Sequence, residues 1–107
     1  PTKIAEENSL LLCVRAPVGI VNITKRNICI GRGLCSIKPL GNMPLLFFFY
    51  VIQTLKSDFE DRATGSTFKA ISREIIYNEL IPIPPIEEQK RIVEKIEAIL
   101  PKLETLI

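Results

Sequence analysis

An apolar stripe along the last part of the chain, residues 86–107, constrains the fold most. Five large aliphatic residues there follow one another at spacings of four, three, four and three positions. They are Ile92, Ile96, Ile99, Leu103 and Leu106. A mean period of about 3.5 residues is typical of a helix that packs against another helix in a coiled coil. The other positions are mostly charged, so the segment is predicted to be a helix with one apolar face and to provide a helix–helix interface.

Two interpretations of this helix stay open. A second apolar row, Val93, Leu100 and Ile107, widens the stripe, and the repeat runs for only about three heptads. The stripe can therefore be buried against a partner helix or against the rest of its own domain. Pro101 removes one backbone hydrogen bond, but by the heptad count it lies away from the stripe. We therefore expect a bend there rather than the end of the helix.

Short apolar segments separated by Pro, Gly and Asn precede the helix, a pattern that favours antiparallel strands. We expect strands at residues 9–16, 20–24, 28–30 and 34–38, and an edge strand at 80–83. Residues 25–27 would form a basic hairpin tip between the second and third of these strands. Residues 1–8 are polar and are expected to lead into the first strand.

Two helices are predicted between the sheet and the final helix. Pro44 is favourable in a first turn, and residues 45–55 are apolar nearly all round, so this helix should be mostly buried and end in the charged, exposed residues 56–62. Residues 71–77 fit a shorter helix with Ser72 as its N-cap.

A chain of 107 residues that is 47% hydrophobic suffices for one small domain with a compact core. The fold class expected is α+β. A small antiparallel β meander or barrel-like sheet with a buried helix is followed by a long C-terminal coiled-coil-type helix. We place a boundary between a globular part, residues 1–85, and the helix, residues 86–107.

The charge is unevenly distributed although the net charge is only +2. Residues 8–57 contain no acidic side chain, and after an acidic cluster at Asp58, Glu60 and Asp61 the stretch 62–73 is again only basic. A face of this sign suits the phosphates of nucleic acid. The alternative is a solvated basic surface without a partner, because the charges alternate with apolar residues. The candidate DNA-binding residues in the first stretch are Arg15, Lys25, Arg26, Arg32 and Lys38.

The segment Gly65-Ser66-Thr67 is the best local candidate for binding a phosphate oxygen. Glycine permits close backbone approach, and the hydroxyls and backbone N–H groups are donors. Lys69 and Arg73 would add positive charge on the same side. The alternative is a plain connecting loop.

Enzymatic chemistry is not expected from this chain. It has no histidine, the commonest general base, and no nucleophile with a base beside it. Gly31-Arg32-Gly33 lacks the rest of a nucleotide-binding loop. The three cysteines, Cys13, Cys29 and Cys35, match no zinc pattern and are predicted to be buried and reduced. We expect no metal and no cofactor.

The membrane is not an expected partner either. The apolar stretch at residues 44–52 is far too short to span a bilayer. The N-terminus lacks the basic, apolar and small-residue regions of a signal peptide, so we expect a cytoplasmic protein.

The order of these pieces resembles the specificity subunit of type I restriction–modification systems. The resemblance covers residues 9–107 and runs through LLLCVRAPVGIVNIT, ICIGRGLCSIKP, GSTFKAIS and LIPIPPIEEQKRIVEKIEAIL. The last two blocks are the most specific. In that family a strand ending in IPIPP, followed by Glu88-Gln89 and Ile92-Val93, closes a target recognition domain and starts the conserved spacer helix.

This resemblance implies part of a target recognition domain at residues 1–85 and a spacer or dimerisation helix at 86–107. Family members carry two such domains, each reading half of a split DNA site, held apart by two antiparallel helices. Methyltransferase subunits dock around them and contain the S-adenosylmethionine and the methyl-transfer residues. The partners implied are duplex DNA, the methyltransferase (modification) subunit and the restriction subunit.

A full member is several times longer, so the chain is expected to match the back of one recognition domain plus one helix. Base-reading residues vary within the family, and none is carried over. A second hypothesis is therefore an assembly module whose helix docks a methyltransferase subunit or a second copy as a homodimer. A third is a regulatory β/α domain without a role in nucleic-acid binding. The target sequence and the methylated base cannot be predicted.

Overall fold

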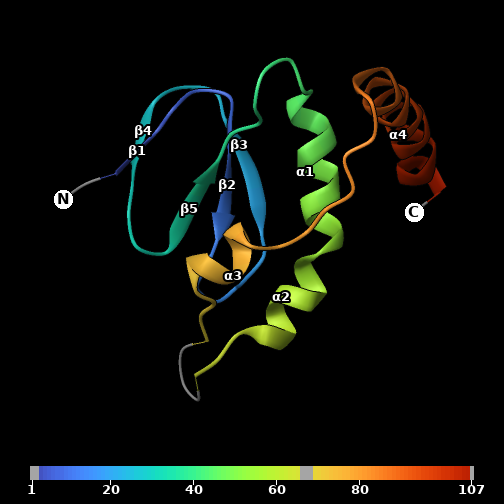
Figure 1. The fold of residues 1–107 in the computed structure, drawn as a ribbon. Coiled ribbons are helices and arrows are strands. Elements are labelled where there is room, and N and C mark those ends of the chain that lie inside the picture. Colours follow the sequence, from blue (N-terminus) through green and yellow to red (C-terminus); the bar gives the residue numbers. More distant parts are fainter. Residues whose placement is uncertain (1–2, 66–68, 107) are drawn as a thin grey trace.

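The computed structural model describes residues 3–65 and 69–106, with only the backbone for 104–106. The chain is mixed α/β, and α1 lies between the sheets and α4 (Figure 1). The strands are β1 (Lys3–Ala5), β2 (Ser9–Cys13), β3 (Val21–Thr24), β4 (Ile28–Ile30) and β5 (Leu34–Ile37). The helices are α1 (Leu45–Thr54), α2 (Lys56–Arg62), α3 (Arg73–Tyr77) and α4 (Ile86–Leu106).

β2 is the central strand of a three-stranded antiparallel sheet with the order β3-β2-β5. In its register, Leu12 pairs with Val21 on one side and with Cys35 on the other. β4 pairs instead with β1 in a second, two-stranded sheet. The predicted α+β class with antiparallel strands is confirmed, but the strands do not follow one another as a simple meander. The described strands form no closed barrel.

Two strand predictions need correction. The polar segment at the start contains β1, which pairs with β4 and buries Ala5 completely. Conversely, the edge strand expected at residues 80–83 is wrong, because this segment has no ladder partner in the described part of the chain and Leu80 is 92% exposed. Pro82 has no N–H to donate to a ladder, which disfavours pairing there.

The core lies where α1 covers the three-stranded sheet. Phe47, Phe48 and Ile52 on α1 pack into one cluster with Leu10 and Leu12 of β2. Burying one such large side chain contributes about 1.5–3 kcal/mol to the stability of the fold. The prediction that this helix is mostly buried is confirmed for these three side chains. The charged end expected for this helix is a separate helix, α2. It is not wholly exposed, since Phe59 anchors it in the core with 1% of its surface accessible.

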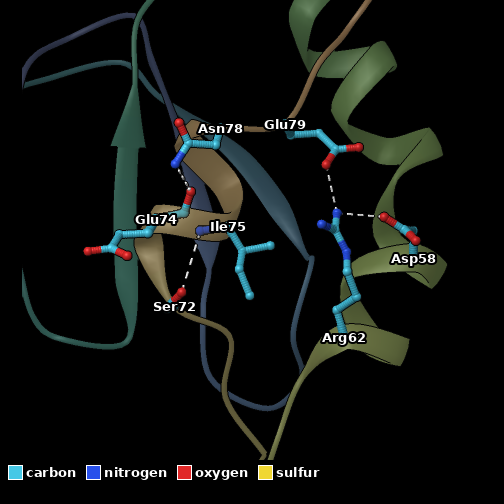
Figure 2. Close-up of polar contacts among 7 residues, drawn as sticks. All are labelled: Asp58, Arg62, Ser72, Glu74, Ile75, Asn78 and Glu79. Carbon is cyan, nitrogen blue, oxygen red and sulfur yellow. Dashed lines mark hydrogen bonds and ion pairs between the residues drawn. The ribbon is translucent and has the colours of Figure 1, made fainter.

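The link from α2 to the segment after α3 is polar. Arg62 Nη2 donates to Asp58 Oδ2 at 2.6 Å and to Glu79 Oε2 at 2.7 Å (Figure 2). The hydrogen bond to Glu79 is the main reason that the pKa of Arg62 lies above its usual value. The N-cap predicted for α3 is confirmed, because the Ile75 N–H donates to the Ser72 hydroxyl at 3.4 Å.

A buried glutamine fixes the corner between the proline-rich segment and α4. Gln89 is only 1% exposed, and its Nε2 donates to the Pro84 carbonyl at 2.8 Å. The N–H groups of Glu88 and Gln89 donate to the Pro85 carbonyl at 2.9 and 3.0 Å. The pair Glu88-Gln89, which the sequence analysis singled out, therefore fixes the direction in which α4 leaves the proline-rich segment.

α4 itself agrees closely with its prediction. It begins at Ile86, where the sequence pattern begins, and continues through Pro101 to Leu106. None of the helices within residues 3–65 and 69–106 is long and apolar enough to cross a membrane.

The cysteines differ from one another in exposure. Cys35 is buried, and burial raises the pKa of its thiol to about 11. Cys13 is half-buried, whereas Cys29 is exposed, so the prediction that all three are buried is wrong for Cys29. Side chains alternate between the two faces of a strand, and on β4 the neighbouring Ile30 is buried while Cys29 is on the exposed side. No group of three or more potential metal ligands occurs in the described residues.

Candidate nucleic-acid interface

Three chain segments that are distant in sequence meet at the end of β2. The Val14 N–H donates to the Gly33 carbonyl at 2.9 Å, and the Ile71 N–H donates to the Val14 carbonyl at 2.8 Å. The Ala16 N–H donates to the Lys69 carbonyl at 2.9 Å. These backbone bonds fix the segments around residues 14–16, 31–34 and 69–73 relative to one another.

Three of the predicted DNA-binding residues come together there. Arg15, Arg32 and Arg73 line an open groove of about 640 Å³, which we call the arginine groove. Its other lining residues are Val14, Ala70, Ile71, Ser72 and Glu74. The side chains of Arg15 and Arg32 are exposed, and that of Arg73 is half-buried. Like charges that line one groove raise the local concentration of anions, so the groove is the strongest candidate for contact with phosphates.

Arg73 differs from Arg15 and Arg32 because part of its guanidinium is already engaged in hydrogen bonds within the protein. Nη2 donates to the Arg32 carbonyl at 3.1 Å and to the Leu34 carbonyl at 2.9 Å. The positive charge also acts on Cys35, where it opposes the effect of burial on the thiol pKa. The sequence shows Arg73 only as one more cation, because these contacts depend on where β5 pairs.

The loop proposed to bind phosphate is closed by backbone pairing. Thr64 and Ala70 donate to each other, with N–O distances of 2.9 and 3.0 Å, and Gly65 has a φ of 123°. Ser66 and Thr67 lie outside the described residues. Lys69 is exposed and lines a groove next to the arginine groove, together with Lys56, Glu60 and Asp61.

The remaining predicted cations lie at the opposite end of the sheet. Ser9, at the start of β2, pairs with Thr24, and Leu10 pairs with Ile37, so Lys25, Arg26 and Lys38 follow near that end. A rise of about 3.3 Å per residue separates the two ends of β2 by about 13 Å. Basic residues that are close in the sequence are thus divided between two ends of one sheet.

Two further details of this second end depart from expectation. Lys25 and Arg26 do not form a hairpin tip, because β3 and β4 pair in different sheets. They lie exposed in a turn that Thr24 stabilises, since its hydroxyl donates to the Arg26 carbonyl at 2.6 Å. Lys38 forms an ion pair with Glu6 at 2.7 Å, and the pKa of Glu6 is lowered by that hydrogen bond.

The apolar stripe of α4 is divided along its length. Ile92 and Val93 pack against the core, and Ile96 lines an apolar groove with Phe47 and Tyr50 of α1. Farther along, Ile99, Leu100 and Leu103 are 41%, 37% and 49% exposed, and we call these three residues the outer stripe. Leu106 lies where only the backbone is described.

Where the stripe changes from covered to exposed, a polar contact joins α4 to α1. The Tyr50 hydroxyl donates to Glu97 Oε2 at 2.9 Å. Desolvation and the Glu97 carboxylate raise the pKa of Tyr50. This contact was not foreseen, since nothing local in the sequence links the two residues.

The known proteins with similar sequences are specificity subunits of type I restriction enzymes. The family described as "Type I restriction modification DNA specificity domain" matches residues 1–106. A type I restriction enzyme MjaX specificity subunit from Methanocaldococcus jannaschii is 41% identical over 100 residues, which are 92% of this chain and 24% of the relative. The MjaIX specificity subunit of the same organism is 29% identical over 92 residues, 84% of this chain and 21% of the relative.

Solved structures give the same picture. The HsdS subunit from Thermoanaerobacter tengcongensis is 33% identical with a TM-score of 0.86, over 99% of this chain and 25% of that chain. A chain from a study of complex assembly and conformational transition of the type I R-M system is 35% identical with a TM-score of 0.84, over 99% of this chain and 26% of that chain. The chain thus spans about a quarter of the length of these relatives. The family match over residues 1–106 and these identities show that the chain belongs to the family of type I restriction modification DNA specificity domains.

Proposed function

We propose that this chain is a DNA-binding part of a type I specificity subunit and that the arginine groove contacts the phosphates of duplex DNA. The observation that carries this proposal is the convergence of Arg15 and Arg32, from two separate segments, on one groove with exposed guanidinium groups. Arginine presents several N–H donors in a fixed fork that matches phosphate oxygens. The family description, which is that of a DNA specificity domain, supports the same function.

The second basic end of the sheet extends the proposed contact. Lys25 and Arg26 are exposed and lie beyond the far end of β2 from the groove, and β2 itself is about 13 Å long by the rise per residue of a strand. B-DNA carries a phosphate about every 3.4 Å along each strand, so one duplex is long enough to reach both ends. Lys69, and the segment Gly65-Ser66-Thr67 that precedes it in the sequence, are proposed as further phosphate contacts.

The proposal is tested by fluorescence anisotropy of a labelled duplex of random sequence, titrated with the chain across a salt series. We expect the logarithm of the affinity to fall linearly with the logarithm of the salt concentration. The double variant Arg15→Gln/Arg32→Gln should flatten that slope by about 1.8, since each lost phosphate contact removes about 0.9. A matched control is Arg91→Gln/Lys95→Gln, which removes two exposed charges of α4 and should leave the slope unchanged.

Two results would refute parts of the proposal. Absence of binding at low salt would exclude a DNA-binding role for this chain alone. An unchanged slope for the Arg15/Arg32 variant would exclude the groove as the contact. Replacing Lys25 and Arg26 by glutamine tests the second end, and we expect a loss that is similar for all DNA sequences.

The same function assigns a second task to α4, which is to dock another helix through the outer stripe. The partners we propose are the methyltransferase subunit of the same system, with the restriction subunit in the same assembly, or a second copy of this chain. The related solved structure that comes from a study of complex assembly supports this idea. In this proposal the chain is not itself an enzyme and works in the cytoplasm, and methyl transfer belongs to the partner subunit.

A further inference from the structure

We propose that Arg73 is a positioning residue, which holds the Gly31–Gly33 turn so that Arg32 faces the arginine groove. This inference rests on the proposed DNA-binding function and divides the three arginines into two kinds. Arg15 and Arg32 would contact DNA with their exposed guanidinium groups, and Arg73 would act through Arg32.

The contacts of Arg73 point to this role. Its Nη2 bridges two backbone carbonyls, that of Arg32 at 3.1 Å and that of Leu34 at 2.9 Å. The Arg32 carbonyl belongs to the peptide unit between Arg32 and Gly33, and the Leu34 carbonyl to the unit between Leu34 and Cys35. A single guanidinium nitrogen therefore restrains two peptide units on either side of the Gly33–Leu34 peptide. Hydrogen bonds from a charged donor are stronger than neutral ones, which makes the restraint effective even at a partly exposed site.

The turn has few other restraints. Arg32 lies between Gly31 and Gly33, and glycine has the greatest conformational freedom of any residue. The bond that closes the turn, from the Leu34 N–H to the Gly31 carbonyl, is long at 3.4 Å. A Cβ built at Gly31 would meet no atom of the described chain within 4 Å, so no side-chain packing supports that side. Among the described residues, the turn is also held by the bond from the Val14 N–H to the Gly33 carbonyl and, at its end, by the pairing of Leu34 with Cys13 in the β2–β5 ladder.

Arg73 can hold the turn because its own backbone is fixed in place. It is the first residue of α3, directly after the N-cap Ser72. Ile71 and Ile76 on either side of it are buried, at 4% and 7% exposure. The guanidinium is therefore presented to the turn from an anchored backbone.

Positioning and direct contact predict different results for a charge-conserving substitution. Lysine keeps the positive charge, but its side chain is one bond shorter than the path to Arg73 Nη2. Arg73→Lys should therefore retain a phosphate contact and lose the bridge to the two carbonyls. Direct contact also predicts that the effects of Arg73 and Arg32 add. Positioning predicts that they do not, because once Arg32 is removed there is no guanidinium left to position.

The experiment measures the affinity of the whole chain for a random-sequence duplex in the wild type, Arg73→Lys, Arg73→Gln, Arg32→Gln and Arg73→Gln/Arg32→Gln. Both single changes at Arg73 should weaken binding about tenfold, or about 1.4 kcal/mol. The double variant should lie within about twofold of Arg32→Gln. Arg91→Lys, an equal exchange at a side chain whose hydrogen bonds within the described part of the chain go to Glu88, is the matched control and should bind like the wild type. Wild-type affinity in Arg73→Lys, or additive losses in the double variant, would overturn the proposal.

Amide hydrogen exchange separates this inference from the proposed function. The Val14 and Leu34 amides donate to the turn, and both should exchange faster in Arg73→Lys and Arg73→Gln but not in Arg91→Lys. If exchange is unchanged, Arg73 does not hold the turn. If exchange responds but the wild type does not bind DNA, the proposed function fails while the role of Arg73 in holding the turn stands. Should Arg73→Gln fail to fold, the Arg73→Lys variant alone decides between the two readings.

Discussion

Two glycines in turns illustrate how much a single residue depends on its surroundings. Gly19 has a φ of +92°, and a Cβ there would lie 2.9 Å from Cγ and 3.2 Å from Cα of Lys56. A Cβ at Gly33 would meet only Arg15 Cδ, at an ordinary contact distance of 3.8 Å. Gly19 is therefore required by both conformation and space, whereas Gly33 is not required by either.

We predict opposite effects of alanine at these two positions. Gly19→Ala should lower the free energy of unfolding by more than about 1 kcal/mol, because alanine is strained in this conformation, and its Cβ would clash with Cγ of Lys56 and crowd the Lys56 backbone. Gly33→Ala should raise it by about 0.4–1 kcal/mol, because it restricts the unfolded chain. Urea unfolding of both variants measures the difference, and equal midpoints would contradict it.

Burial of Cys35 predicts a loss of stability at alkaline pH. The thiol pKa is about 11 in the folded chain against an ordinary value of 9.0, so the folded state binds this proton more tightly. The stabilising contribution is complete below pH 9 and is lost as the pH rises towards 11. The urea midpoint should fall over this window more steeply in the wild type than in Cys35→Ala. Cys29→Ala, at an exposed thiol, should behave like the wild type, and identical curves for all three would contradict the prediction.

Single residues were predictable from sequence where their partners are near in the chain. The Ser72 N-cap bonds to a residue three positions away, and a local pattern suffices to find it. Arg73 bonds to carbonyls 41 and 39 positions away, and nothing local indicates that its guanidinium faces the backbone. The same holds for Tyr50 and Glu97.

At the scale of elements, the sequence pattern predicted where helices and strands begin better than it predicted which strands pair. α4 and β4 begin where their sequence patterns begin, since period and propensity are local properties. The pairing of β5 with β2 and of β1 with β4 could not be predicted from the sequence, because the residue pattern of a strand does not indicate which other strand it pairs with. The segment at residues 80–83 has a strand-like composition, yet it lacks a ladder partner among the described residues.

The divided stripe of α4 predicts a difference between two isoleucines on the same face. Ile92 packs against the core and lines the groove beside Phe47, whereas Ile99 is 41% exposed. Ile92→Ala should lower the free energy of unfolding by about 2 kcal/mol, the lower end of the range for core positions, because the site is only half-buried. Ile99→Ala should change it by less than about 0.5 kcal/mol. Denaturant unfolding at low protein concentration measures both, and equal losses would mean that α4 is covered along its whole length.

For the whole molecule, the order of strands decides where charge accumulates. The acid-free stretch of the sequence suggested one basic face, but β2 lies between β3 and β5, and its two ends receive different cations. Ion pairs reduce the basic character further, as at Lys38 with Glu6 and at Arg62 with Asp58 and Glu79. Composition therefore predicted an anionic partner, and the fold shows which of the basic residues share one groove.

The two ends of the molecule should be separable by mutation, because the outer stripe and the arginine groove share no residue. Leu103→Glu introduces a charge at a side chain that is 49% exposed and should reduce self-association through α4. The same variant should keep the salt slope of DNA binding. Lys95→Gln, which changes the net charge equally but lies off the stripe, is the control. Sedimentation equilibrium measures the mass. A mass unchanged by Leu103→Glu would exclude the outer stripe as the dimer contact, and a wild-type chain that is monomeric at all concentrations would leave the methyltransferase subunit as its proposed partner.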